Sequence, residues 1–217
     1  MKVGVLGTGM VGQAIGGKLV ELGHDVRMGS REAGGEKATG WVTATGEGAS
    51  EGDFADAAAH GELVFNCTAG IASLDVLESA GSDNLAGKVL VDVANPLDFS
   101  QGSPPRLKYV NDDSLGERIQ AAFPEARVVK SLNTMNCSVM VEPGLVPGDH
   151  VVFVCGDDDS AKSDVGTLLS SFGWPAGRII DLGGIVACRG TEMFLPLWLS
   201  TMGTLGTGIF NIAVMKD

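Results

Sequence analysis

A glycine-rich turn near the start of the chain has the residue types and spacing of a phosphate-binding loop: Gly7-Thr8-Gly9-Met10-Val11-Gly12. It follows an apolar run and leads into a segment with helical apolar periodicity. In such a strand–turn–helix unit Gly7 permits the tight turn, Gly9 lets the backbone approach a pyrophosphate, and Gly12 allows the helix to pack closely on the strand. The N–H groups at the helix start face the phosphate oxygens. The motif therefore predicts a dinucleotide site.

The end of the second expected strand indicates which dinucleotide the turn would hold. An NAD site usually has Asp or Glu here, because a carboxylate binds the ribose hydroxyls. This chain has Gly29, Ser30 and Arg31 instead. A serine hydroxyl can donate a hydrogen bond, and a guanidinium can pair bidentately with a phosphate. The pattern favours NADP(H), with its 2′-phosphate at Ser30 and Arg31, and Lys37 is placed to add a further positive charge.

The elements that must position these residues follow from the apolar pattern. Short valine-rich runs are typical of buried parallel strands and occur at Val3–Leu6, Asp25–Met28, Leu63–Cys67, Val89–Val93 and Val128–Leu132. Helices are predicted by periodicity or capping signals at Val11–Leu22, Asp53–His60, Ala72–Ala80 and Ser114–Pro124, and a short one is compatible with Lys37–Thr45. Alternating strands and helices predict an α/β fold with a doubly wound parallel sheet of the Rossmann type.

The apolar pattern in the last part of the chain predicts a small C-terminal α/β unit docked on this sheet. We therefore expect a Rossmann domain over residues 1–138 and the smaller unit over residues 139–217. The unit should contain a strand at His150–Cys155, a helix up to Phe172, a strand at Arg178–Leu182 and a helical region from Ile185 to the C-terminus. Three acids at 157–159 open its first helix. Acids at a helix start more often cap it than bind metal, so no metal site is predicted.

Composition narrows the classes of partner. The chain of 217 residues has a formal net charge of −12, which disfavours binding to nucleic acid or to an anionic membrane. No apolar run reaches the ~18 residues that a membrane span needs, and no signal peptide is evident. The four cysteines are scattered without a CxxC pair, which is typical of free thiols in a reducing compartment. We expect a cytoplasmic protein without nucleic-acid or membrane partners.

Several stretches together resemble one family, the NADP-dependent deazaflavin (coenzyme F420) reductases. They are "GTGMVGQAIGGKLVELGHDVRMGSRE", "LVFNCTAG", "VLVDVANPL", "ARVVKSLNTM" and "VFVCGDDDSAK". The resemblance covers nearly the whole chain. It implies a Rossmann domain with a small C-terminal unit, usually a homodimer, and hydride transfer between NADPH and the deazaflavin, with the two rings stacked in a cleft. The family also covers relatives that use flavin instead, among them the cytosolic domains of membrane metalloreductases.

The resemblance also assigns site residues by position. It implies a 2′-phosphate site at Ser30 and Arg31, with Thr8 nearby. It implies pyrophosphate contacts from the backbone of Gly9, Met10 and Val11. The nicotinamide cleft is implied at the ends of three later strands: at Thr68 and Ala69, at Ala94 and Asn95, and at Asn133 to Cys137.

Side chains that could serve as a general acid or base are scarce near this cleft. His24 and His150 precede strands, and His60 ends a peripheral helix. Lys130 lies inside a strand, where a lysine reaching a polar edge or a partner subunit is more typical than a base. A carbonyl substrate would need such a group, whereas hydride transfer between two rings needs mainly positioning. No catalytic side chain is predicted.

Three functions stay open at this point. The favoured one is an NADPH-dependent oxidoreductase with a deazaflavin or flavin-like co-substrate. The others are an NADP-dependent reductase of a small imine or carbonyl compound, and a non-catalytic NADP(H)-sensing protein. For the favoured one we expect the acceptor ring over Asn133–Cys137, beside Ala94, Asn95 and Pro96, with the long loop Leu97–Asn111 closing over it. Apolar residues and small glycines in Met202–Met215 predict a homodimer contact there.

Overall fold

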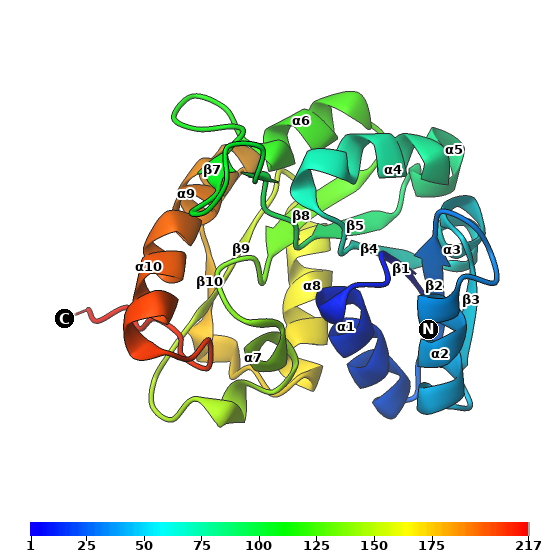
Figure 1. The fold of residues 1–217 in the computed structure, drawn as a ribbon, viewed down its shortest axis with the longest axis horizontal. Helices are drawn as coiled ribbons and strands as arrows, with labels where there is room; N and C mark the ends of the chain where they lie inside the picture. Colours follow the sequence, from blue (N-terminus) through cyan, green and yellow to red (C-terminus); the bar gives the residue numbers. More distant parts are fainter. Residues whose placement is uncertain (217) are drawn as a thin grey trace.

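A computed structural model describes residues 1–216 and places eight strands in one sheet, in the order β10-β9-β8-β5-β4-β1-β2-β3 (Figure 1). These strands are β1 (Lys2–Leu6), β2 (Asp25–Ser30), β3 (Ala49–Asp53), β4 (Leu63–Asn66), β5 (Val89–Asp92), β8 (Arg127–Ser131), β9 (Val152–Cys155) and β10 (Ile179–Asp181). The chain crosses from one side of β1 to the other between β3 and β4. This doubly wound order confirms the predicted Rossmann-type α/β fold.

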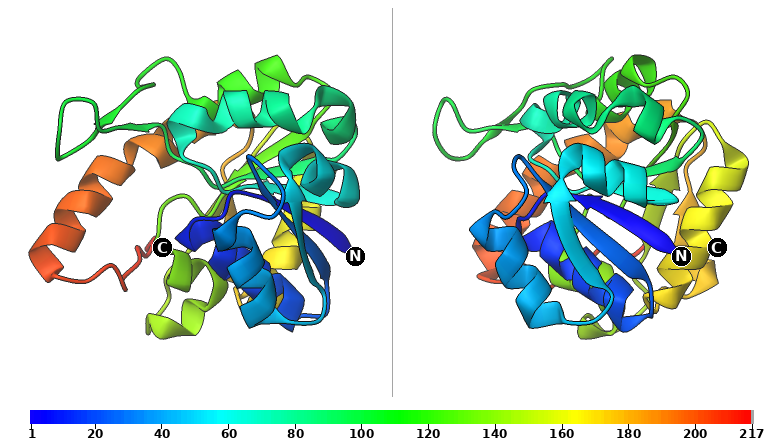
Figure 2. Two further views of the ribbon diagram at one scale, coloured as in Figure 1. Left: turned by 45° about the vertical axis from the view of Figure 1, so that its right-hand side comes forward. Right: turned by 90° about the vertical axis from the view of Figure 1, so that its right-hand side faces the viewer.

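Helices cover both faces of the sheet, and Figure 2 shows the sheet between the two layers. They are α1 (Met10–Glu21), α2 (Glu36–Thr45), α3 (Phe54–His60), α4 (Ser73–Ala80), α5 (Ser82–Leu85), α6 (Leu115–Ala122), α7 (Cys137–Val141), α8 (Asp159–Ser171), α9 (Cys188–Met193) and α10 (Leu195–Leu205). Single 3-10 turns occur at Gly70–Ala72, Pro143–Leu145, Ala176–Arg178 and Ile185–Ala187. Among residues 1–216, no helix combines the length and the apolar character needed to cross a bilayer.

The core is divided into two apolar layers by the alternation of side chains along each strand. On one face Val3, Val5 and Phe65 pack with residues of α1, α2, α7 and α8. On the other face Leu6 and Val64 pack with residues of α3, α4 and α6. Both layers are needed because a parallel sheet is stable when both its faces are covered. The carboxyl ends of six parallel strands are thereby held at one edge.

Besides the direction of β9, described below, three features of the fold differ from the sequence-based expectations. The strand β3 was not predicted, because Ala49–Asp53 is small and acidic and lies at the sheet edge. The last helix does not continue to the C-terminus: α10 ends at Leu205, and Gly206 takes a left-handed φ of 68° at its C-cap. The expected loop Leu97–Asn111 contains a small antiparallel hairpin of β6 (Leu97–Asp98) and β7 (Arg106–Leu107).

The last part of the chain extends the same sheet in the opposite direction. Strand β9 pairs antiparallel with β8, through Lys130↔Cys155 and Ser131↔Val154, and β10 then runs parallel to β9. Downstream, the Val151 N–H donates to the Ile212 carbonyl at 3.0 Å, which returns the C-terminal segment to the start of β9. The division of the chain at residue 138 stays a prediction.

Candidate nucleotide and hydride-transfer site

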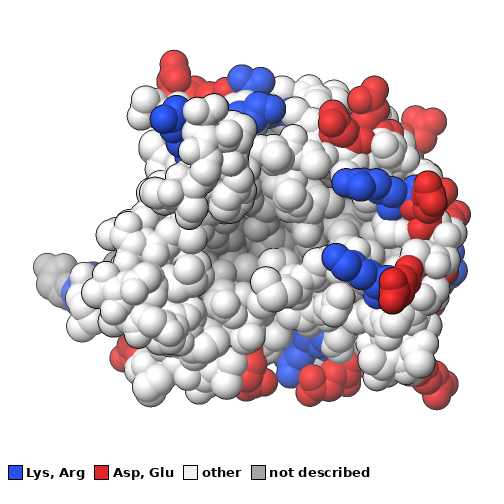
Figure 3. Space-filling view, in the orientation of Figure 1, with Lys and Arg blue, Asp and Glu red and all other residues white. Residues whose placement is uncertain are grey.

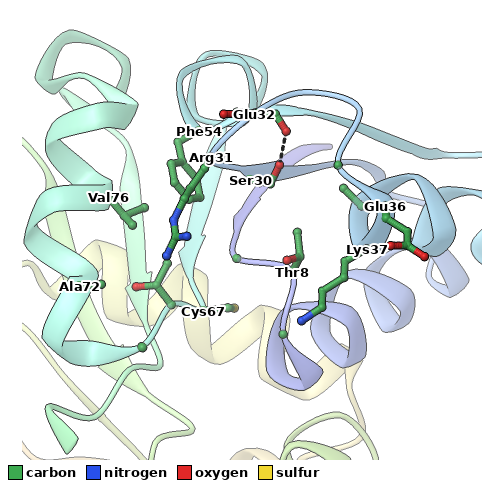
Figure 4. A pocket seen from close by; sticks show the side chains of 16 residues that line it. Thr8, Ser30, Arg31, Glu32, Glu36, Lys37, Phe54, Cys67, Ala72 and Val76 are labelled. Atoms are coloured by element: carbon green, nitrogen blue, oxygen red, sulfur yellow. Dashed lines mark hydrogen bonds between the residues drawn. The ribbon is translucent and has the colours of Figure 1, made fainter. Parts of the chain in front are cut away.

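A pocket of about 660 Å³ lies at the carboxyl ends of β1, β2 and β4. It brings together seven of the predicted site residues: Gly7, Thr8, Gly9, Ser30, Arg31, Thr68 and Ala69. The remaining lining residues are Glu32, Gly35, Glu36, Lys37, Ala38, Phe54, Cys67, Ala72 and Val76. Figure 4 shows Arg31 on one side of the pocket and Lys37 on the other, with Thr8 between them. The pocket therefore joins the glycine turn to the end of the second strand.

The glycine turn has the geometry that a pyrophosphate needs. Gly7 has a φ of 116°, which favours glycine, and a Cβ on Gly12 would lie 1.9 Å from the Gly7 carbonyl oxygen. A Cβ on Gly9, by contrast, would meet no atom within 4 Å, so this residue faces open space. Helix α1 begins after Gly9 with neither a side-chain cap nor an acidic residue in its first turn. Its leading N–H groups suit a phosphate, so the residues present fit the nucleotide.

The corner at the end of β2 carries both positive and negative side chains. Arg31 and Lys37 line the pocket, and within residues 1–216 neither makes an ion pair closer than 4.0 Å. The Ser30 hydroxyl already donates to the Glu32 carbonyl oxygen at 2.6 Å (Figure 4). It must rotate before it can donate to a ligand. Glu36 also lines the corner, so the charge available to an anion comes from two cations set against two carboxylates.

The other predicted site residues lie outside this pocket's lining. Met10 is exposed and Val11 half-buried at the start of α1, and Cys137 is half-buried at the start of α7. Ala94, Asn95 and Asn133 follow β5 and β8, further along the same sheet edge. The face of the molecule in Figure 3 is hollowed near its centre, and uncharged residues form most of the surface around that hollow.

The turns after β4, β5 and β8 are in direct contact. A Cβ on Gly70 would lie 2.2 Å from the Asn95 carbonyl oxygen, so the first two turns touch through their backbones. The Asn95 amide donates to the Asn133 carbonyl at 2.7 Å, and the Asn133 amide donates back to Asn95 Oδ1 at 3.0 Å. Leu132, just before Asn133, is buried and has a φ of 64°. A branched, buried residue rarely adopts this left-handed conformation.

A buried charge cluster lies beneath these turns and was missed by the sequence analysis. Lys130 is 1% exposed, and its Nζ lies 2.7 Å from Asp92 Oδ2 and 2.7 Å from Glu192 Oε1. The expectation that Lys130 reaches a polar edge or a partner subunit is therefore wrong. The signal was a lysine within a buried valine-rich strand, since a buried charge requires partners. Burial alone would lower the pKa of Lys130, but the two carboxylates raise it above its usual range. Lys130 thus stays protonated and is no general base.

The three histidines, Cys67 and Asp158 do not offer a catalytic group to the pocket. The three histidines lie against Met1, Asp25 and Pro143, away from the pocket. Burial, with a contribution from Asp92, raises the pKa of the Cys67 thiol, so this pocket residue is not a ready nucleophile. Of the acids at 157–159, Asp158 caps α8 by accepting from the Ala161 N–H at 2.8 Å, as predicted.

The sequence and fold of this chain are similar to those of known NADP-dependent oxidoreductases. The family model for NADP oxidoreductases, coenzyme F420-dependent, matches residues 2–96. The crystal structure of a candidate F420-dependent NADP reductase from Arthrobacter sp. FB24 is 51% identical, covers 100% of both chains and superposes with a TM-score of 0.94. The rat metalloreductase STEAP3 is 29% identical over 214 residues, which are 94% of this chain. The chain spans only 39% of that metalloreductase.

A more distant likeness concerns the fold alone. An imine reductase from Streptomyces aurantiacus is 21% identical, with a TM-score of 0.64 over 95% of this chain and 64% of the reductase. The family is decided by the Arthrobacter structure, whose identity and full coverage extend the match beyond residue 96. The chain belongs to the coenzyme F420-dependent NADP oxidoreductase family.

Proposed function

We propose that this protein binds NADPH in the pocket at the ends of β1, β2 and β4 and serves hydride transfer to a deazaflavin (coenzyme F420) or flavin-like ring. The observation that carries the proposal is the pocket itself. It combines an uncapped α1 N-terminus behind an open Gly9 with two cations, Arg31 and Lys37, that have no ion-pair partner among residues 1–216. When bound, NADPH supplies the hydride and the chain supplies the geometry.

On the nucleotide side, each group of residues has one task. The N–H groups of Met10 and Val11 hold the pyrophosphate at the start of α1. Arg31 and Lys37 hold the 2′-phosphate, and an acid is absent from the position that usually binds the ribose of NAD. Thr68 and Ala69 form the pocket wall that leads towards the turn after β5.

On the acceptor side, the ring that receives the hydride enters through the hollow of Figure 3. The nicotinamide end of a nucleotide in this fold lies outside the carboxyl ends of the strands, at the point where the strand order reverses. An acceptor ring stacked on it lies over Asn133–Cys137, beside Ala94, Asn95 and Pro96. Figures 1 and 2 show the segment with β7 and the helices α9 and α10 together at one end of the molecule, next to β9 and β10. In this proposal these elements exclude water from the reacting rings.

The burial or position of Lys130, Cys67 and the three histidines favours a ring acceptor over a carbonyl or imine compound. A carbonyl or imine substrate needs a group that can deliver a proton as the hydride arrives. Lys130 is buried in its ion pairs, and burial raises the pKa of the Cys67 thiol. The three histidines lie against Met1, Asp25 and Pro143, away from the pocket. Hydride transfer between two rings places its main demand on distance and stacking.

The test is NADPH oxidation, followed at 340 nm, against a panel of acceptors. The panel contains the deazaflavin, flavin mononucleotide, a ferric chelate, a small ketone and a cyclic imine. We expect turnover with the deazaflavin or the flavin and none with the ketone or imine. Turnover of the ketone or imine alone would overturn the ring acceptor. Binding of NADPH without any turnover would favour an NADP(H)-sensing protein instead.

We also propose a homodimer formed through α10 and the segment that follows it. Leu197 and Leu205 are 61% and 57% exposed on α10, and Met215 is also exposed. Large apolar side chains exposed together favour association. Leu197→Glu should convert a dimer into a monomer in sedimentation velocity at micromolar concentration, while Met10→Gln, at an exposed apolar residue of α1, should not. A wild-type chain that sediments as a monomer would contradict the proposal.

A further inference from the structure

A continuous chain of polar side chains runs from the pocket wall to the C-terminal helices. Thr68 Oγ1 donates to Asn66 Oδ1 at 2.7 Å, and Asn66 Nδ2 donates to Asp92 Oδ1 at 2.9 Å. Lys130 Nζ donates to Asp92 Oδ2 and lies within 2.7 Å of Glu192 Oε1. All but Thr68 are buried. The wall of the nucleotide pocket is thereby connected to α9 through hydrogen bonds that are shielded from water.

This series of hydrogen-bonded side chains fixes the backbone just before Asn95. Lys130 Nζ donates to the Ala94 carbonyl at 2.7 Å, and the Ala94 N–H donates to Asp92 Oδ1 at 3.1 Å. Both polar backbone groups of Ala94 are therefore held by buried charged side chains. Asn95 follows directly and is paired with Asn133 through the two amide hydrogen bonds. The turn after β5 is held from below by the cluster and from the side by Asn133.

The backbone of the neighbouring turn is also held in an unfavourable conformation. Leu132 is 1% exposed and left-handed, and such residues persist only where their surroundings determine them. This conformation directs the chain from β8 into Asn133. Strained backbone of this kind concentrates at sites where exact placement of a group matters more than local stability.

The charges of the cluster do not cancel, and the fold compensates for the excess. One lysine faces two carboxylates, which leaves a net charge of −1. Glu192 also accepts from the N–H groups of Leu115 and Gly116, at 2.9 and 3.1 Å, at the positive end of α6. Buried ion pairs can often be replaced by apolar residues without loss of stability. Stability alone therefore gives no account of why this one is present.

We infer that Lys130 is a positioning residue that orders the nicotinamide half of NADPH. Held between Asp92 and Glu192, it fixes the Ala94–Asn95 turn on the nicotinamide side and ties that turn to α9 on the acceptor side. The inference rests on the proposed function, because it presupposes that NADPH binds in the pocket. It assigns Lys130 no contact with the reacting atoms.

The test compares a double variant with a matched single variant. Lys130→Met with Glu192→Gln removes one charge of each sign and the contact with the Ala94 carbonyl. Glu192→Gln alone keeps that contact and still offers an oxygen to α6. The probes are 2′,5′-ADP, which lacks the nicotinamide half, and NADPH, whose fluorescence reports the surroundings of its nicotinamide ring. Thermal unfolding of each variant is measured in parallel.

We expect 2′,5′-ADP to bind all three proteins with affinities within about twofold, since the adenosine half is untouched. The double variant should lose most of the NADPH fluorescence enhancement and bind NADPH about 2- to 10-fold more weakly, the range for one lost hydrogen bond. Glu192→Gln, which keeps the contact between Lys130 and the Ala94 carbonyl, should lose clearly less of both than the double variant. A folded double variant with wild-type NADPH fluorescence and affinity would overturn the inference. A wild type that binds neither probe would overturn the proposed function and the inference with it.

A second variant covers the case in which the double variant does not fold. Asn95→Ala breaks the amide pair with Asn133 at a half-buried, uncharged position. It should lower the NADPH fluorescence enhancement in the same direction without changing 2′,5′-ADP binding. A folded Asn95→Ala protein with unchanged NADPH fluorescence would show that this turn does not order the nicotinamide.

Discussion

The ends of β1 and β2 and the ends of β5 and β8 lie along the same edge of one sheet but are built differently. At β1 and β2 the pocket is open, and its groups are backbone N–H groups and exposed side chains such as Arg31. At β5 and β8 the ionised groups of Asp92 and Lys130 are almost fully buried and paired with each other. Ligand contacts in the first region can be altered by substitution without disturbing the core. In the second region, the charged side chains that hold the turns are themselves part of the buried core.

The largest effect should come from the buried region. Glu192→Ala leaves Lys130 with one carboxylate and leaves the N–H groups of Leu115 and Gly116 without their acceptor. Removing one partner of a buried ion pair costs about 3–5 kcal/mol. Urea unfolding should show a loss of this size, and Glu192→Gln a smaller one because its amide oxygen can still accept from α6. A loss below about 1 kcal/mol for the alanine variant would mean that water reaches the cluster.

The glycine turn should show the opposite behaviour, a large change in binding with little change in stability. Gly9→Val adds its side chain where no atom lies within 4 Å, so the chain should fold. The added methyl groups occupy the approach of the pyrophosphate to the α1 N-terminus, and NADPH binding should weaken by about 100-fold or more. Gly17→Ala, also in open space but further along α1, serves as the control and should leave NADPH binding unchanged. Wild-type affinity in Gly9→Val would place the nucleotide elsewhere.

Within the open pocket, Arg31→Ala should change selectivity between nucleotides. A charge-assisted hydrogen bond contributes about 1.5–3 kcal/mol, so NADPH should bind about 10- to 100-fold more weakly and NADH nearly as before. Lys37→Ala should have a smaller effect, because an ammonium cannot form the bidentate contact. Calorimetric titration of both nucleotides measures this. Equal losses of affinity for NADPH and NADH would mean that Arg31 stabilises the pocket and does not bind the 2′-phosphate.

The smallest effect concerns a surface ion pair outside both regions. A hydrogen bond from Arg127, with those from Ala161 and Ser160, holds the pKa of Asp158 below its usual range. Because the folded pKa is depressed, the contribution of Asp158 to stability is fully present above the unfolded pKa of about 4, shrinks as the pH falls below it, and is lost only as the pH passes through the folded pKa. Asp158→Asn should therefore lower the Tm more at pH 6 than at pH 3.

Asp164→Asn is the control for this pH dependence. Its carboxylate is 3.8 Å from Arg127 and 61% exposed, so its substitution should leave the Tm nearly unchanged at both pH values. If Asp158→Asn lowers the Tm equally at pH 6 and pH 3, the effect comes from helix capping and not from the ion pair.

The arrangement of the glycine turn and of Ser30 and Arg31 could be predicted from the sequence, because these residues lie close together in the chain. The glycine turn is six consecutive residues between a strand and a helix, and Ser30 and Arg31 follow directly from the end of β2. Steric requirements at Gly7 and Gly12 dictate these residue types wherever the turn occurs. Most of the strands and helices also followed from short-range patterns of apolar residues, with β3 as an exception.

The contacts of the second region could not be predicted in this way, because the residues that pair with one another are far apart in the chain. Asp92 and Lys130 are separated by 38 positions and are joined only by the pairing of β5 with β8. Glu192 comes from a helix that follows β10. The reversed direction of β9 was likewise hidden, since it depends on the path of the chain after β8. A charged residue within each apolar run was the available signal, and it indicated burial without identifying the partner.

Calorimetric titration of the wild-type protein with NADPH and with NADH shows whether this pocket holds NADPH and selects it through its 2′-phosphate. We expect one site per chain and an affinity for NADPH at least about tenfold above that for NADH, as expected for one charge-assisted contact. The preference should shrink with added salt, since the cations are exposed. Equal affinities for the two nucleotides, or tighter binding of NADH, would contradict it.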